Sequence, residues 1–307
     1  MFDLHRLRLL RELKHRGTLA AVAAALSYSP SSVSQQLSLL ETEVGVPLLE
    51  PVGRRVRLTE QAEILVAHTE AVLERLERAE ADIASSLTEL TGALRVACFQ
   101  TASLTLVITA LTLLRDTHPR LRVHVTQVEP EIALPALLAR DHDLVITEEY
   151  PGDPHPRVAE LDVEQLCEDP LRLAQPRGTR VARSGKGAVG PTEALRALAG
   201  HPWVLEPEGS AARRWAISLC RQVGFEPDVR FESSDLLLHR RLVERGLAVA
   251  LLPDLVWEGR RPTVPLRRLP RGHQARRLLT VVRAGRGGHP AIRACRAALR
   301  EAAGTLS

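Results

Sequence analysis

The chain has 307 residues, with 41 Lys and Arg against 37 Asp and Glu and an isoelectric point near 9.2. This length predicts two or three domains. The content of 45% hydrophobic and 25% charged residues is ordinary for a globular protein, and the 3% aromatic content excludes a large base-stacking platform. From residue 259 to residue 300 the chain carries many arginines and no acid. Such a segment is compatible with nucleic-acid contact or with a solvated face.

The four cysteines, Cys98, Cys167, Cys220 and Cys295, lie far apart in the sequence. They form no C-x-x-C pair and have no histidine cluster near them, so the sequence predicts no metal site. Buried free thiols in a reducing compartment are the expected state, with a two-cysteine redox sensor as the alternative. The charged N-terminus lacks an apolar run long enough for a signal peptide or a membrane helix, and a cytoplasmic location is expected.

The first sixty residues predict short helices separated by polar turns. Leucines recur at helical spacing over residues 4–13 and Gly17 ends that helix. A second helix follows to Leu26, and a third begins after the turn at Pro30 and ends at Gly45. Two short helices joined by a tight polar turn are a candidate helix-turn-helix. The alternative is a small helical bundle with a solvated polar face.

The outer face of the third predicted helix carries short polar side chains, Ser31, Ser32, Ser34 and Gln35. Hydroxyl and amide groups of this size reach phosphates and base edges without blocking entry to the major groove. Residues 46–59 then predict a short hairpin, or wing, with Arg54 and Arg55 at its tip. Arginine in this position suits contact with phosphate or with the minor groove.

The segment LAAVAAALSYSPSSVSQQLSLLETEVGVPLLEPVGRRVRLT resembles the winged helix-turn-helix of LysR-type transcriptional regulators. The resemblance implies that the recognition helix meets DNA at Pro30, Ser31, Ser32, Ser34, Gln35 and Gln36, and that Arg54 lies on the wing. The chain departs from the family pattern at Leu49, where Phe is common, and at Pro51, where an Arg is usual. Arg55 replaces a frequent Gly and can compensate for that lost charge.

Residues 60–91 predict one long helix that starts after Thr59 and is ended by Gly92. A narrow apolar stripe runs along it, formed by Leu65, Val72, Leu76, Ala79, Ile83 and Leu90. Such a stripe on a charged helix requires a partner. The resemblance implies the linker helix that pairs two subunits, and the alternative is packing against the same chain.

Beyond Gly92, strand patterns alternate with helix patterns, which predicts parallel sheets in two α/β lobes. The segments THPRLRVHV, DHDLVIT and ERGLAVALLP resemble the family's effector-binding domain, whose fold is similar to periplasmic binding proteins. The fold class expected is therefore α/β behind an all-α, winged N-terminal domain. The expected domains are 1–59 (DNA-binding), 60–91 (linker) and 92–307 (effector-binding). Within the last, lobe I takes 92–165 and 265–307, and lobe II takes 166–264.

Ligands of such folds bind between the lobes, at strand C-termini and helix N-termini. The loops predicted to lie there supply Gln100, Thr101, Ala102, Ser103, Glu148, Glu206, Pro207 and Ser210 as candidate effector contacts. Glu149 and Glu208 belong to the same loops. The concentration of acids favours a cationic or amine-bearing effector over a simple dicarboxylate. The alternative is that these acids face solvent or cap helices.

No catalytic motif, phosphate loop or dinucleotide fingerprint is present, so the sequence predicts neither an enzyme nor a cofactor. The function expected is a homodimeric or homotetrameric regulator that binds double-stranded promoter or operator DNA and a small-molecule effector, without membrane contact. One alternative is a solute-binding module or an enzyme on the same two-lobed fold. Another is an architectural DNA-binding protein without effector sensing.

Overall fold

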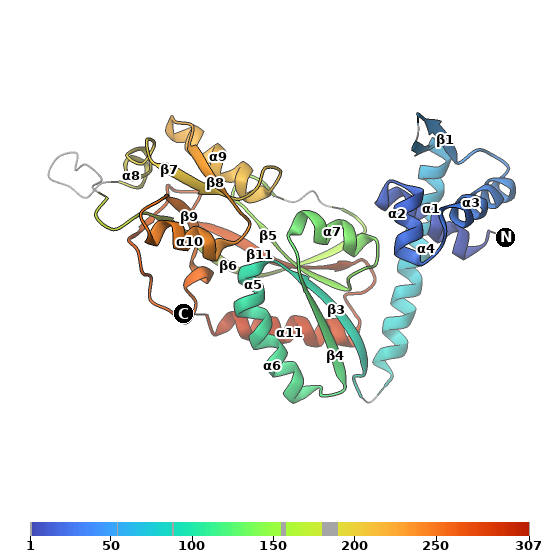
Figure 1. Cartoon of the computed structure of the whole chain (residues 1–307). Coiled ribbons are helices and arrows are strands. Elements are labelled where there is room, and N and C mark those ends of the chain that lie inside the picture. The colour runs from blue at the N-terminus through green and yellow to red at the C-terminus, as the bar shows by residue number, and fades with distance from the viewer. Residues whose placement is uncertain (1, 54, 88, 155–157, 180–189, 307) are drawn as a thin grey trace.

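The computed structural model describes residues 2–53, 55–87, 89–154, 158–179 and 190–306. A small helical domain stands at one end of a long helix, and the other end of that helix leads into a larger α/β domain (Figure 1). Across these ranges no helix is both long enough and apolar enough to cross a membrane. The expected fold class is confirmed.

The N-terminal domain has the predicted elements: α1 (Leu4–Arg16), α2 (Leu19–Leu26), α3 (Pro30–Val44), β1 (Leu49–Val52) and β2 (Arg55–Leu58). The caps explain these bounds. Thr18 and Ser29 accept hydrogen bonds from backbone N–H groups at the starts of α2 and α3, while Gly17 and Gly45 adopt left-handed conformations after α1 and α3. Leucines and valines from the three helices form one buried core that continues into the start of the next helix.

The long helix α4 (Glu60–Ser85) starts after Thr59, whose hydroxyl accepts a hydrogen bond from Ala62 N at 3.2 Å. It ends at Ser85, well before Gly92, where the sequence placed its end. The hydroxyls of Ser85 and Ser86 donate to the carbonyls of Ala81 and Ile83 at 2.8 and 2.7 Å. Ser86 N also donates to the carbonyl of Ile83 at 3.0 Å, a three-residue spacing with which the regular helix ends.

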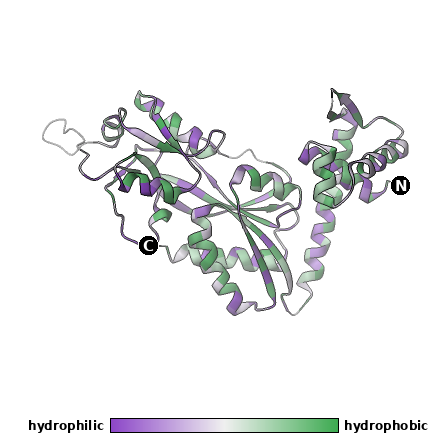
Figure 2. Cartoon of the chain, in the orientation of Figure 1, coloured by the Kyte–Doolittle hydropathy of each residue, from purple (hydrophilic) through white to green (hydrophobic). Residues whose placement is uncertain are grey.

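Helix α4 buries one stripe of side chains against its own chain and leaves a neighbouring apolar stripe exposed. One face is buried against the same chain; its members are Ala62, Val66, Thr69, Leu73, Glu77 and Ala81. The neighbouring stripe leaves Val72, Leu76 and Ile83 exposed by 47%, 43% and 66%, and its pairing with a second subunit stays a prediction. Hydrophobic and hydrophilic residues accordingly alternate along this helix (Figure 2). Leu65 and Leu90, expected on the exposed stripe, pack against the cores of their own chain.

The α/β domain is built on a seven-stranded sheet of order β10-β6-β11-β5-β3-β4, with β9 also paired to β6. Its strands are β3 (Gly92–Cys98), β4 (Leu121–Gln127), β5 (Leu144–Glu149), β6 (Leu161–Ala174), β9 (Ala250–Pro253), β10 (Leu266–Arg268) and β11 (Ala275–Arg283). A second, two-stranded sheet joins β7 (Pro202–Leu205) and β8 (Asp228–Glu232) in parallel. Strand β6 runs from the lobe I sheet into lobe II, so the two lobes share it.

Helices cover both lobes. Lobe I carries α5 (Gln100–Ala102), the π-helix η1 (Ser103–Val107), α6 (Ile108–Thr117), α7 (Pro130–Leu138) and α11 (Pro290–Gly304). Lobe II carries α8 (Pro191–Arg196), α9 (Ala211–Val223), α10 (Leu236–Glu244) and the short 3-10 helix η2 (Asp254–Trp257). Each lobe has its own buried apolar cluster.

Two details differ from the sequence prediction. The sheet is mixed rather than parallel, because β11 pairs antiparallel with both β5 and β6. The segment VPLRRL does not return to lobe I, because β10 pairs with the lobe II end of β6 and Leu266 packs against the lobe II core. The chain returns to lobe I only with β11.

The turn after β11 packs tightly against α4. Gly285 has a φ of +86°, and a Cβ atom there would lie 2.6 Å from the carbonyl oxygen of Glu74. Arg286 pairs with Glu80 of α4 at 2.9 Å. The absence of a side chain at residue 285 therefore allows the linker helix to contact lobe I.

Candidate DNA-binding face and interlobe cleft

The outer face of α3 is exposed and polar. Ser31, Ser34 and Gln35 are exposed, whereas Val33 and Leu37 are 1% exposed and pack in the domain core. The 3.6-residue period of the helix produces this separation, because residues three and four apart share a face. Pro30, the first residue of α3, is exposed at the same end.

Two of the predicted DNA contacts make side-chain hydrogen bonds within the domain. The hydroxyl of Ser31 lies 2.9 Å from the hydroxyl of Ser29, which also accepts from Ser32 N at 3.1 Å and so caps the helix. The side-chain oxygen of Gln36 accepts a hydrogen bond from Arg6 Nε at 3.1 Å. Gln36 is thus held against α1, while Gln35 is exposed.

The wing is positioned by a contact that the sequence reasoning did not single out. The carboxylate of Glu41 in α3 accepts hydrogen bonds from the backbone N–H groups of Leu48 and Leu49 at 2.8 and 3.0 Å. Strand β2 then returns with Arg55 opposite Val52. Arg54 and the side chain of Arg55 lie outside the described residues, so their predicted contact with DNA stays a prediction.

A buried arginine, Arg276 of β11, lies at the centre of the cleft between the lobes. Its guanidinium is 1% exposed and pairs with Glu148 of β5 and, at 2.8 Å, with Asp169 of β6. It also donates to the hydroxyl of Thr101 at 2.8 Å, and it stacks over the Phe99 ring at 5.0 Å. The charge of Arg276 is therefore already balanced by acids of its own chain.

Further acidic residues lie near Arg276, so the carboxyl groups around it outnumber its single positive charge. Burial and the nearby Glu148 and Glu131 raise the pKa of Glu129 to about 7. Burial, Glu148 and Glu129 likewise raise the pKa of Glu206 well above its usual value. Burial disfavours the charged form of each carboxyl, and the like charge of Glu148 adds to that effect in both.

The structure brings together some of the predicted effector residues and leaves others apart. Thr101, Glu148 and Glu206 converge on the Arg276 centre. Ala102 is buried in the lobe I core and Ser103 starts η1 beside Cys98. Pro207 and Ser210 form the turn that caps α9, with Ser210 Oγ accepting from Arg213 N at 3.1 Å.

The remaining acids named from the sequence point elsewhere. Glu149 pairs with Arg277 at 2.6 Å, and Glu208 is exposed. The sequence reasoning missed Glu129, Asp169 and Arg276. Arg276 and Asp169 could have been found because each is a charged residue within a segment that has a strand pattern. In a sheet covered by helices, such a residue places its charge inside the domain.

Hydrogen bonds across the cleft hold the lobes together. The side chain of Gln100 donates to Asp235 at 2.9 Å and accepts from Leu236 N at 3.0 Å, at the start of α10. Glu131 of α7 accepts from Ala211 N at 2.9 Å, at the start of α9. Both helix N-termini are thus occupied by side chains of lobe I.

A small cavity lies beside Glu206, inside lobe II. It is bounded by Tyr150, Glu206, Trp215 and His239 and has a volume of about 20 Å³, which is room for about one water molecule. Arg276 itself is 1% exposed, so a ligand that contacts it has to displace side chains of the cleft.

The C-terminal end of α7 contacts the DNA-binding domain. Arg16 of α1 donates to the carbonyl of Ala139 at 3.1 Å and pairs with Asp141 at 2.8 Å. Arg11, which is 1% exposed, donates to the carbonyl of Leu138 and pairs with Glu70 of α4. Helix α7 therefore spans from the acidic cleft at Glu129 to the first helix of the DNA-binding domain.

Comparison with known proteins identifies the family. Residues 4–63 match the model described as the bacterial regulatory helix-turn-helix protein of the lysR family, and residues 87–304 match the LysR substrate binding domain. The two matches cover most of the chain. The protein belongs to the LysR family of DNA-binding transcriptional regulators.

Individual relatives agree with this assignment. The chain is 25% identical over 252 residues to the transcriptional dual regulator GltC of Bacillus subtilis, covering 82% of this chain and 81% of GltC. It is 30% identical over 252 residues to a probable hydrogen peroxide-inducible genes activator of Mycobacterium leprae, covering 81% and 76%. The structure of a full-length OxyR variant from Pseudomonas aeruginosa matches with a TM-score of 0.69 at 20% identity over 100% of this chain and 98% of that one. These relatives are regulators and not enzymes, as the sequence predicted.

Proposed function

We propose that this protein is a sequence-specific regulator that binds operator DNA through α3 and the wing and responds to a cationic or amine-bearing effector in the interlobe cleft. The exposed polar face of α3 supports the first half of the proposal. Ser31, Ser34 and Gln35 present hydroxyl and amide groups at the N-terminal end of a helix whose other face is fixed in the domain core. This is the geometry with which recognition helices contact base edges.

The surplus of buried acid supports the second half. Glu148 and Asp169 pair with one guanidinium, that of Arg276. Burial, followed by repulsion from neighbouring carboxylates such as Glu148, raises the pKa of Glu129 and of Glu206. A cation that enters the cleft displaces these protons and pairs with the carboxylates of Glu129 and Glu206, which form no ion pair with any of the described residues. A dicarboxylate adds to the repulsion, because Arg276 is already neutralised.

The exposed stripe on α4 supports the predicted homodimer or homotetramer. Val72, Leu76 and Ile83 lie on one side of the helix and contact none of the described core clusters. A second copy of α4 would bury them. Replacing Leu76 by Glu is expected to shift the mass in solution toward the monomer, while Arg75→Glu, a neighbouring exposed control, leaves it unchanged.

The names of several relatives raise peroxide sensing as a second candidate. A peroxide-sensing cysteine requires an accessible thiolate. The four cysteines of this chain are free, and burial raises their thiol pKa to about 11 for Cys98 and Cys167 and to about 12 for Cys220 and Cys295. These environments disfavour thiolate chemistry, so we prefer the cationic effector.

Helix α7 offers the route from effector to DNA. Opening the cleft breaks the bond from Glu131 to Ala211 N and relieves the repulsion at Glu129, both at the start of α7. The other end of α7 holds α1 through Arg16 and Arg11. A small displacement of this helix thus changes the position of the DNA-binding domain on the effector domain.

The decisive test of DNA binding is fluorescence anisotropy with duplex from the gene's upstream region and with a scrambled duplex, each at two salt concentrations. A preference for the upstream duplex that persists at the higher salt supports specific binding. Equal, salt-sensitive binding to both duplexes points to the architectural alternative. No binding at low salt leaves the solute-binding alternative.

A further inference from the structure

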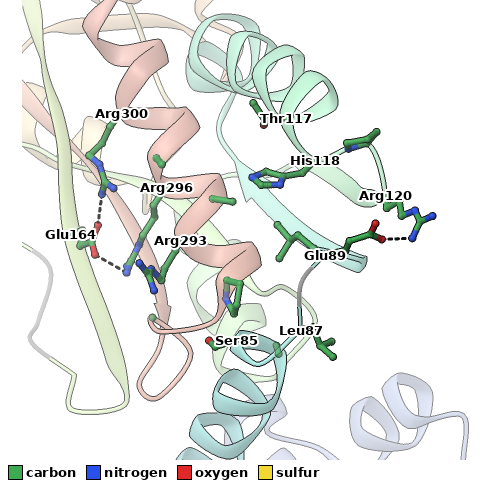
Figure 3. A pocket seen from close by; sticks show the side chains of 17 residues that line it. Ser85, Leu87, Glu89, Thr117, His118, Arg120, Glu164, Arg293, Arg296 and Arg300 are labelled. Carbon is green, nitrogen blue, oxygen red and sulfur yellow. Dashed lines mark hydrogen bonds and ion pairs between the residues drawn. The ribbon is translucent and has the colours of Figure 1, made fainter.

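A second cavity lies far from the cleft, where the linker helix meets the effector domain. This groove has a volume of about 1120 Å³ and is lined by the end of α4, the corner after α6 and one side of α11 (Figure 3). We call it the linker groove. Its lining residues include Ser85, Leu87, Glu89, His118, Arg120, Glu164, Arg293, Arg296, Ala297 and Arg300.

The charge of the linker groove is positive. Arg120, Arg293, Arg296 and Arg300 line it together with the acids Glu89 and Glu164. Arg120 pairs with Glu89, and both are well exposed. Pairs of this kind contribute little stability and are easily exchanged for a new anion.

The arginines of α11 form the strongest part of this surface. Arg296 is 3% exposed and is fixed by Glu164 at 2.9 Å and by the hydroxyl of Thr280 at 3.1 Å. Arg300 shares the same carboxylate, Glu164, at 3.0 Å. The side chain of Arg293 lies between them and the linker end, and none of the described residues pairs with it.

Apolar atoms occupy the rest of the groove wall. Leu87 and Leu90 follow α4, Pro119 follows α6, and Ala294 and Ala297 belong to α11. A guanidinium with no partner beside an apolar wall fits an anionic group carried on an apolar body, because each part finds its complement. Inorganic anions would use only half of this surface.

We propose that the linker groove is a second ligand site, which binds a small organic anion, a phosphate or carboxylate attached to an apolar body. Arg293 and Arg300 hold the anionic group, and the apolar part lies against Leu87 and Ala297. Such a ligand connects α11 to the end of α4 and fixes the direction in which the linker helix leaves lobe I. The site differs from the proposed cleft in place and in the sign of charge that it binds.

Calorimetry on the full chain at pH 8 tests the proposal with phenyl phosphate, phenylacetate and inorganic phosphate as probes. At least one aromatic anion is expected to bind at least tenfold more tightly than inorganic phosphate, and the better probe identifies the anionic group. The double variant Arg293→Gln/Arg300→Gln is expected to weaken that binding at least tenfold. The control Arg260→Gln/Arg261→Gln removes the same charge from two exposed arginines of lobe II and leaves the binding within twofold.

Two further variants distinguish binding in the linker groove from a general effect of charge and from binding in the cleft. Ala297→Trp fills the groove without removing charge, so binding of the aromatic anion is expected to be lost. The fold is expected to tolerate this substitution because Ala297 is exposed. Glu206→Gln alters the cleft and is expected to leave binding of the aromatic anion unchanged. Failure of the cleft proposal can therefore be distinguished from failure of the linker-groove proposal. Absence of aromatic-anion binding, equal binding of inorganic phosphate, or full binding by the double arginine variant would overturn the proposal.

Discussion

The DNA-binding face and the interlobe cleft present their polar groups in opposite ways. On α3, Ser31, Ser34 and Gln35 are exposed, and the helix needs no rearrangement to present them. In the cleft, Arg276 and Glu148 are buried and paired with each other. One site is a surface that is complete before its partner arrives. In the other, a ligand has to exchange internal bonds for bonds of its own.

This contrast has an energetic consequence. Removing a side chain from an exposed recognition surface affects binding and leaves folding unchanged. Removing one member of a buried charge cluster leaves its partners buried without compensation, which destabilises the fold itself. The two regions should therefore respond differently to equally small substitutions.

The largest effect is expected at the cleft centre. Arg276→Met leaves Glu148 and Asp169 buried without their cation, so the free energy of unfolding should fall by about 3–5 kcal/mol. Urea denaturation followed by circular dichroism measures the change. The neighbouring Arg277→Gln, whose side chain is 50% exposed, serves as the control and is expected to change stability by less than about 1 kcal/mol. Equal effects of the two would contradict the central role of Arg276.

On the recognition helix, Gln35→Ala is expected to weaken binding to the upstream duplex by about 1–3 kcal/mol, or roughly five- to 150-fold. Its unfolding curve should match that of the parent chain, because the side chain is exposed. Anisotropy titration gives the affinity. Thr42→Ala, also exposed but near the other end of α3, is the matched control with unchanged affinity. If Gln35→Ala lowered the stability of the fold but left the preference for the upstream duplex unchanged, Gln35 would be a structural residue and not a DNA contact.

The pH dependence of stability tests whether the carboxyl of Glu129 is protonated in the folded chain. Because the pKa of Glu129 is raised to about 7 in the folded chain, folding favours its protonated form. Its contribution to stability is complete below the unfolded pKa of about 4.5 and is lost as the pH rises toward 7. The melting temperature should fall over this window, and Glu129→Gln should flatten that fall. An unchanged slope in the variant would show that Glu129 is not the group responsible.

A smaller effect is expected where the two regions meet. The pair of Arg16 and Asp141 joins α1 to the residues after α7, and Asp141 is exposed. A double-mutant cycle with Arg16→Ala and Asp141→Ala should give a coupling energy of about 0.2–1 kcal/mol. The same variants should reduce any effect of a cleft ligand on DNA affinity. Full retention of that effect would exclude this contact from the coupling.

The sequence predicted the DNA-binding domain far better than the cleft, and the reason is the range of the interactions involved. Thr18, Ser29, Gly17 and Gly45 act on neighbours within a few residues, so the helix bounds follow from local patterns. The resemblance added the residues expected to meet DNA on the recognition helix and the wing. Only the end of α4 was misplaced, because the helix ends with a three-residue hydrogen bond from Ser86 N to the carbonyl of Ile83, before the glycine at residue 92.

The cleft depends on residues that are distant along the chain. Arg276 meets Glu148 and Asp169 only because β11 lies between β5 and β6. The alternation of strand and helix patterns indicated two lobes, but it did not indicate that β11 returns antiparallel between β5 and β6. The sequence therefore identified Glu148 and Glu206 as cleft residues and missed Arg276, the cation that pairs with Glu148.

The central claim is that the acidic cleft controls the DNA-binding face through a cationic ligand. The most direct measurement is the affinity for the upstream duplex at pH 8 with and without a linear diamine such as 1,5-diaminopentane, in the parent chain and in Glu206→Gln. We expect the diamine to change the affinity at least fivefold in the parent chain, a typical allosteric coupling, and to have little effect in the variant. No response to the diamine, together with a clear response to a simple dicarboxylate, would contradict the claim.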